Sequence, residues 1–142
     1  MDKYKIIIDT NVLISGLRSS LGASFKLLSI LHDQRIQLFL SNPVICEYEE
    51  VLKRKHDFIH LDFKEIEAFI DDICAIASVK NIFFLWRPSL SDPDDDLFVD
   101  LAVASNIDYI ITFNTSNFLN AKKMGIKVIT PKEFLLKLGE IQ

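Results

Sequence analysis

Short apolar runs alternate with longer segments of helical periodicity along the 142-residue chain. The runs are rich in β-branched and aromatic residues and predict strands at 4–8, 36–40, 82–86, 108–112 and 127–129. Strands that alternate with helices indicate βαβ units around a parallel sheet. The first and fourth runs are apolar almost throughout, as expected of strands that are covered on both faces.

Capping residues mark where most of the helices begin. Asn42 followed by Pro43 places an N-cap residue before a proline at the first helical position. Asp62 and Thr130 are each followed three residues later by a glutamate, as in a capping box. The pattern also predicts helices over 22–33, from 63 to 79, from Asp92-Pro93 onward, and over 115–124, where Gly125 ends the helix.

The composition is typical of a globular protein, and we expect a single domain over residues 1–142. Apolar residues make up 49% of the chain. The longest apolar run has five residues, too few to cross a membrane. The apolar start is too short for a signal peptide, and the two cysteines fit free thiols in a reducing cytosol. We therefore expect a cytoplasmic protein.

Two carboxylates lie near the sheet edge at which α/β proteins bind ligands, beyond the carboxyl ends of the strands. Asp9 directly follows three isoleucines, and it either caps the next helix or belongs to a site. Glu47 lies about 100° from the centre of the apolar stripe of its helix. It is either a solvated flank residue or able to reach a cleft.

A run of aspartates opens the helix after Asp92-Pro93. One or two carboxylates are enough to cap a helix and complement its dipole, but residues 92–96 hold four. Asp96 and Asp100 are four positions apart, so they share a helix face, beside the apolar stripe. The excess of carboxylates suggests a use beyond capping.

Thr112 and Asn114 follow the fourth predicted strand, which would neighbour the first strand at the switch point of a doubly wound sheet. A hydroxyl and an amide would then share an edge with Asp9. Three carboxylates gathered there would repel one another, and a divalent cation would remove this conflict. Oxygen ligands suit Mg²⁺ or Mn²⁺ rather than zinc. The chain has no His–Cys cluster, nucleotide-binding glycine motif or Gly-x-Ser-x-Gly elbow.

The ordered set of these motifs resembles the PIN domain, in particular the toxin component of bacterial and archaeal toxin–antitoxin systems, which includes the VapC-like ribonucleases. The resemblance covers about residues 4 to 136. It rests on a strand followed by Asp9-Thr10-Asn11, a helix with Glu47 after Ser41-Asn42-Pro43, the Asp-Pro-Asp-Asp-Asp96 run, and the segment from Asp108 to Asn114.

The resemblance implies a three-layer α/β/α sandwich with a central five-stranded parallel sheet. It also implies an endoribonuclease that depends on Mg²⁺ or Mn²⁺. The first three acids of the family match Asp9, Glu47 and Asp96, which would hold the metal. Asp96 is chosen because it lies 16 residues before Thr112. Asp95 is the alternative if the register shifts by one, and Asp100 is a further alternative.

The remaining positions of the motif imply supporting roles. Glu47 would bind the metal directly or through water and accept a proton from the attacking water. Thr112 and Asn114 would position water or phosphate, and Asn11 would brace Asp9. The fourth acid of the family falls on Asn114, which adds no negative charge. Catalysis would therefore be weakened, and a second metal would be held less tightly unless Asp100 or an RNA phosphate helps.

The resemblance also implies an RNA substrate, a cognate antitoxin that covers the acidic cleft, and a homodimer. The helix expected from 63 to 79 is apolar on more than one face, so it either supplies a dimer surface or is buried in the core. The alternative function is a weak or inactive PIN module that acts through a protein partner, which Asn114 favours. A phosphoacceptor receiver fits less well, because the third apolar run ends in Trp86-Arg87-Pro88 rather than in aspartate.

The net charge of −4 argues against a broad surface for duplex DNA. Residues 92–108 hold six Asp and no Lys or Arg, whereas the rest of the chain has 16 basic and 14 acidic residues. The net charge is therefore compatible with an enzyme that binds RNA through a metal ion in a local acidic cleft. The basic groups that flank such a cleft in the sequence are Arg18, Lys53, Arg54, Lys55, Arg87, Lys122, Lys123 and Lys127. Those at 53–55 and 122–127 either contact RNA or are solvated helix ends, where cations suit the helix dipole.

Overall fold

The computed structural model describes residues 3–81 and 93–141. Five parallel strands form one sheet in the order β3-β2-β1-β4-β5. The strands are β1 (Tyr4–Ile8), β2 (Ile36–Ser41), β3 (Ser78–Lys80), β4 (Tyr109–Ile111) and β5 (Lys127–Ile129). The expected parallel sheet with β1 beside β4 is confirmed.

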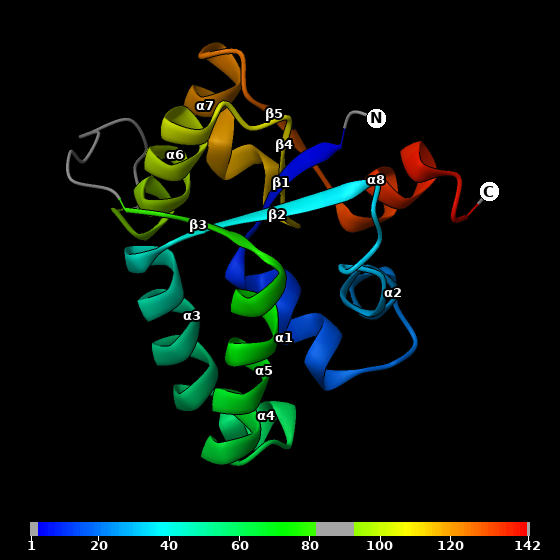
Figure 1. Cartoon of the computed structure of the whole chain (residues 1–142), viewed down its shortest axis with the longest axis vertical. Coiled ribbons are helices and arrows are strands. Elements are labelled where there is room, and N and C mark those ends of the chain that lie inside the picture. Colours follow the sequence, from blue (N-terminus) through cyan, green and yellow to red (C-terminus); the bar gives the residue numbers. More distant parts are fainter. Residues whose placement is uncertain (1–2, 82–92, 142) are drawn as a thin grey trace.

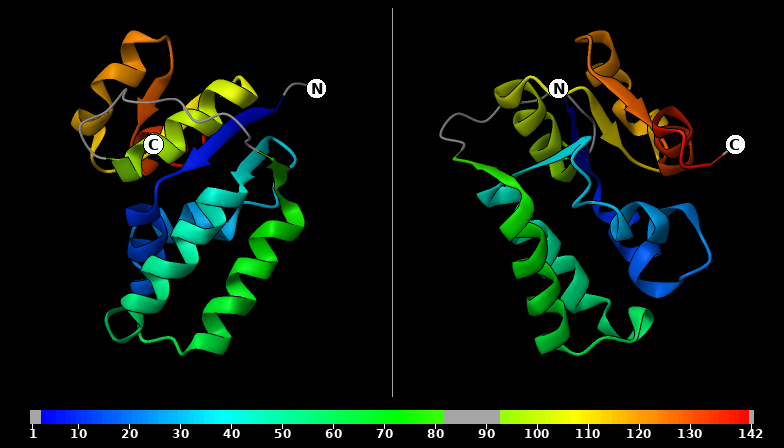
Figure 2. Two further views of the ribbon diagram at one scale, coloured as in Figure 1. Left: turned by 90° about the vertical axis from the view of Figure 1, so that its left-hand side faces the viewer. Right: turned by 45° about the vertical axis from the view of Figure 1, so that its right-hand side comes forward.

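Helices cover both faces of this sheet, which makes the fold an α/β sandwich of three layers (Figures 1 and 2). The helices are α1 (Thr10–Arg18), α2 (Ala23–Ser29), α3 (Asn42–Arg54), α4 (His56–Ile59), α5 (Phe63–Ile76), α6 (Pro93–Ser105), α7 (Leu119–Lys123) and α8 (Pro131–Leu138), with a 3₁₀ turn, η1 (Thr115–Phe118). One side carries α1, α2 and α8, and the other carries α3, α5 and α6. In the part of the chain that the structure describes, no helix is long and apolar enough to cross a membrane.

The central strand is buried from both sides. Ile6, Ile7 and Ile8 of β1 have no exposed surface, as the unbroken apolar run predicted. The register pairs Ile8 with Ile111 of β4, so the two strands end together. The residues that follow them, Asp9 and Thr112, therefore leave the sheet side by side.

The capping signals predicted three helix starts well. The Ser41 hydroxyl accepts a hydrogen bond from the Val44 amide at the start of α3, one residue before the expected cap. Both predicted capping boxes, at Asp62 and at Thr130, have their two reciprocal hydrogen bonds. These capping hydrogen bonds can be predicted from the sequence, because each joins a side chain to a backbone group only three residues away.

Three element predictions need correction. The helix expected over 22–33 is confined to Ala23–Ser29, because tight turns follow it, and the helix expected over 115–124 is divided into η1 and α7. The helix expected to reach 79 ends at Ile76, and Ser78–Lys80 instead pairs with β2 as strand β3. The strand expected at 82–86 lies outside the described residues.

Candidate functional site

Asp9 stands at the carboxyl end of β1 and at the start of α1. Its amide donates to the Ile111 carbonyl at 2.9 Å, which continues the pairing of β1 with β4. Its Oδ1 accepts from the Thr10 amide at 2.8 Å, so the residue is the N-cap of α1. The side chain is buried, with 7% exposed. Capping uses one carboxylate oxygen and leaves the second for a further contact.

Thr112 supplies that contact from the end of β4. Its hydroxyl donates to Asp9 Oδ2 at 2.7 Å and accepts from the Asn114 amide at 3.0 Å. Thr112 has no exposed surface, whereas Asn114 is exposed. We expected Thr112 to position water or phosphate, but its hydroxyl is already committed to Asp9 and to the backbone. Thr112 therefore orients the carboxylate of Asp9.

Glu47 lies on α3, and its side chain is half-buried. The next residue, Tyr48, is buried, and its hydroxyl donates to the carbonyl of Ile8, which directly precedes Asp9. This bond fastens α3 to the end of the central strand. Burial raises the pKa of Tyr48 well above its usual value, and the negative charge of Asp9 adds to the effect.

The third acid lies on α6. Asp96 is within the helix Pro93–Ser105, but its side chain, like that of Asp95, lies outside the described part of the structure. One turn further along, Asp100 is described, and it is buried, with 4% exposed. On the same helix, the Phe98 ring lies 6.3 Å from that of Tyr48, so α6 packs on the helix that carries Glu47.

The donor chemistry of this edge suits a hard divalent cation. The groups around Asp9 are carboxylate, hydroxyl and amide oxygens, and two of them, Thr10 Oγ1 and Asn11 Oδ1, are buried without a hydrogen-bond partner. Among the described side chains, no three of the types His, Cys, Asp and Glu gather as a metal site. A complete set would need Asp96, whose side chain is not among those described.

The basic residues that flank the acids in the sequence lie in different parts of the fold. Lys53 is paired with Glu67 at 2.8 Å and Arg54 with Glu50 at 3.3 Å. Lys127 begins β5 and therefore lies at the opposite edge of the sheet from Asp9. Arg87 lies outside the described residues. Arg18, at the end of α1, is exposed on the helix that Asp9 caps.

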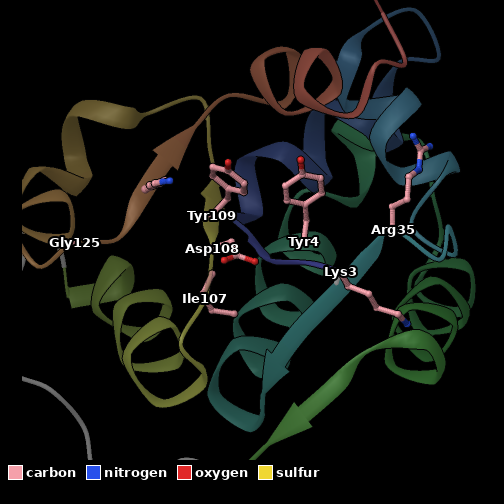
Figure 3. Close-up of a pocket in the computed structure, with 8 residues that line it drawn as sticks. Lys3, Tyr4, Arg35, Ile107, Asp108, Tyr109 and Gly125 are labelled. Carbon is pink, nitrogen blue, oxygen red and sulfur yellow. The ribbon is translucent and has the colours of Figure 1, made fainter. Parts of the chain in front are cut away.

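A cavity of about 450 Å³ opens at that opposite edge, between the amino ends of β1, β4 and β5 (Figure 3). The rings of Tyr4 and Tyr109 line it side by side, and Asp108 accepts a hydrogen bond from the Lys5 amide at 2.9 Å. Among the described candidate residues, Lys127 lines this cavity, whereas Asp9, Glu47 and Asn114 do not.

Comparisons with known proteins identify the family of this arrangement. The chain is 26% identical over 145 residues to the uncharacterized protein MJ1680 of Methanocaldococcus jannaschii, an alignment that covers 94% of this chain and 90% of that protein. A chain of the crystal structure of VapBC2 from Rickettsia felis, bound to a DNA fragment from its promoter, has a similar fold. It superposes with a TM-score of 0.60 at 12% identity, over 87% of this chain and 96% of that chain.

A family model for the PIN domain matches residues 5–116, which include most of β1, Glu47, Asp96 and the whole of β4. This match extends over well more than half of the chain. The chain therefore belongs to the PIN domain family.

Proposed function

We propose that this protein is a metal-dependent endoribonuclease that hydrolyses RNA phosphodiester bonds as the toxin of a toxin–antitoxin pair. The observation that carries the proposal is the Asp9 carboxylate, buried at the switch point and oriented by the Thr112 hydroxyl at 2.7 Å. A buried carboxylate oriented by a second side chain at a ligand-binding edge is typical of a metal ligand with its supporting shell.

Three acids would hold Mg²⁺ or Mn²⁺ in this proposal. Asp9 and Asp96 would bind it directly, and Glu47 directly or through water. When bound, the cation would polarise the scissile phosphate and lower the pKa of a bound water. Glu47 is half-buried on α3 and, in this proposal, would accept the proton from that water. The exposed amide of Asn114 would donate to a phosphate oxygen.

The test is cleavage of a single-stranded RNA with Mn²⁺ by the wild type and by the Asp9→Asn and Asp96→Asn variants. Both substitutions should reduce the rate at least about 100-fold, as loss of a metal ligand or of electrostatic stabilisation commonly does. Asp72→Asn is the matched control, because Asp72 is an exposed acid on α5. Equal cleavage by all four proteins would contradict the proposal.

A second candidate function is a PIN-fold module without turnover, and Asn114 favours it. This residue stands where the family has a fourth acid, and its side chain makes no capping hydrogen bond to η1. Calorimetry with Mn²⁺ distinguishes the two candidates: metal binding without RNA cleavage supports the module. In the enzyme, Asn114→Asp should raise the number of Mn²⁺ ions bound.

We also propose an antitoxin and a second copy of the chain as partners. The structural similarity to a chain of VapBC2, which was crystallised with DNA from its promoter, supports the antitoxin. Exposed apolar side chains on α5 support the dimer, because Phe63 is 50% exposed and Ile76 is 41% exposed. Phe63→Glu should convert a dimer into a monomer in sedimentation experiments.

A further inference from the structure

A groove with two phenylalanine rings runs away from the candidate site along α1. We call it the aromatic groove, and its lining residues are Asn11, Ile14, Ser15, Arg18, Ser19, Phe58 and Phe113, around a cavity of about 580 Å³. The α1 residues at positions 11, 14, 15 and 18 share one face of the helix. At a rise of 1.5 Å per residue, this stripe is about 10 Å long.

The groove begins at the candidate site. Asn11 follows Asp9 by two residues, and Phe113 directly follows Thr112, whose hydroxyl binds Asp9. Its far end lies where α1 meets α4, which supplies Phe58 (Figure 1). A ligand in the groove would therefore extend from the site toward the end of α1.

Both phenylalanine side chains are partly exposed. Phe58 is 47% exposed and Phe113 is 46% exposed, although each has a large apolar side chain. A single exposed phenylalanine is ordinary on a protein surface. Two that line one hollow beside a candidate phosphodiesterase site form an apolar surface on which flat rings can stack.

The far end of the groove carries positive charge. The Arg18 guanidinium lies 3.8 Å from the centroid of the Phe58 ring, and the Lys55 ammonium lies 5.9 Å from it. None of the ion pairs among the described residues uses Arg18. No carboxylate of the described residues therefore pairs with it, and its planar group extends the stacking surface of Phe58.

We propose that the aromatic groove binds an unstacked nucleotide of single-stranded RNA next to the phosphate that is cleaved. Its base would stack on Phe113 or on the Arg18–Phe58 pair, and Arg18 would attract a backbone phosphate. This inference rests on the proposed function and names the form of its substrate. Duplex RNA is excluded from the groove, because paired bases stack on one another and cannot present their faces to protein rings.

The experiment measures RNA binding separately from cleavage. The parent protein is the Asp9→Asn variant in Mg²⁺, and the probe is a fluorescein-labelled single-stranded RNA of about ten nucleotides, within the usual site size of single-strand binders. Phe113→Ala and Phe58→Ala should each weaken binding about tenfold, the typical loss for one stacking ring. Phe113→Tyr keeps the ring and should bind as the parent does.

Two controls separate stacking from a general disturbance of the protein. Phe25→Ala removes a ring of similar exposure, 43%, from α2 outside the groove and should leave binding unchanged. The parent should quench the fluorescence of a 2-aminopurine base in the RNA, and the Phe113→Ala variant should quench it less. Arg18→Ala should reduce the slope of log affinity against log salt concentration by about 0.7, the value for one contact with a single strand.

The outcomes distinguish this proposal from the proposed function. If the wild type cleaves RNA but both alanine variants bind it as tightly as the parent, the groove proposal is wrong and the nuclease proposal stands. If the wild type neither binds nor cleaves RNA, both are wrong. If the two alanine variants lose binding to a protein partner but bind RNA as tightly as the parent, the groove belongs to that partner and the inference is wrong.

Discussion

The Thr112 hydroxyl joins the buried Asp9 carboxylate to the Asn114 amide, because it donates to the first and accepts from the second. Thr112→Val keeps the shape of the side chain but leaves both groups without this partner. We expect a loss of about 1–3 kcal/mol in the free energy of unfolding, measured by urea denaturation. Thr112→Ser keeps the hydroxyl and should recover most of the loss. A valine variant as stable as the wild type would show that this bond contributes nothing.

Tyr48 makes the free energy of unfolding depend on pH in the alkaline range. Its pKa is raised in the folded protein, so the unfolded chain loses this proton first, from about pH 10 upward. The contribution of Tyr48 is therefore complete below pH 10 and is lost as pH rises toward the folded pKa. Tyr48→Phe should cost about 1 kcal/mol at pH 7 by removing the bond to the Ile8 carbonyl. It should also flatten the decline above pH 10, which parallel denaturation curves would measure.

At the scale of elements, α1 and α2 approach closely at Gly16. A Cβ atom at this position would lie 2.5 Å from Leu28 Cδ1 and 3.1 Å from the backbone carbon of Ser24. Gly16→Ala should therefore destabilise the protein by about 1–3 kcal/mol, more than the roughly 1 kcal/mol that alanine gains in a helix.

Two further variants test the cause. Gly22→Ala is the matched control, because a Cβ atom there meets nothing within 4 Å. Leu28→Ala removes the nearest obstacle, so the cost of Gly16→Ala should shrink in that background. An unchanged cost in the double-mutant cycle would show that Leu28 is not the obstacle.

Elements whose signals are local could be predicted from the sequence. The isoleucines of β1 and the capping boxes at Asp62 and Thr130 depend on neighbours within a few residues. Strand β3 could not be predicted, because its three residues are partly polar and become a strand only by pairing with β2. The four-residue helix α4 is likewise too short to show a periodicity.

The candidate site was partly accessible to the same reasoning. The switch-point argument predicted that Asp9 and Thr112 share one edge of the sheet, because strand order decides it. Their hydrogen bond also needs the register that pairs Ile8 with Ile111. The aromatic groove was not predicted, since Phe58 and Phe113 are isolated in sequence. They come to one hollow only because α4 and the segment after β4 both lie beside α1 in the fold. The burial of Asp100 also depends on tertiary packing, although its helix face was known.

At the scale of the whole molecule, Arg35 connects the start of β2 with the end of the chain. Its guanidinium donates to the Leu138 carbonyl at 2.9 Å and pairs with Asp33 and Glu140. Arg35→Ala should accelerate amide exchange at Gly139 and Glu140, whose amides bond to the last turn of α8. Exchange in β1 should be unchanged, and equal acceleration there would contradict a local effect.

The same connection predicts a sensitivity to acid. Hydrogen bonds from Arg35 hold the pKa of Asp33 well below its usual range. The unfolded chain therefore binds this proton first, and the contribution of Asp33 is present above about pH 4 and fades as pH falls further. Between pH 4 and pH 2, the free energy of unfolding of the Asp33→Asn variant should fall by less than that of the wild type. Acid titration at a fixed urea concentration would measure this difference.

The pairing of Asp9 with Thr112 also bears on how the protein is synthesised. The two residues are 103 positions apart, and β1 has no neighbour on that side until β4 exists. A nascent chain that has left the ribosome only as far as β3 carries Asp9 without the group that orients it. N-terminal fragments that end before β4 should therefore lack the assembled edge, so the site can be completed only after β4 has been synthesised.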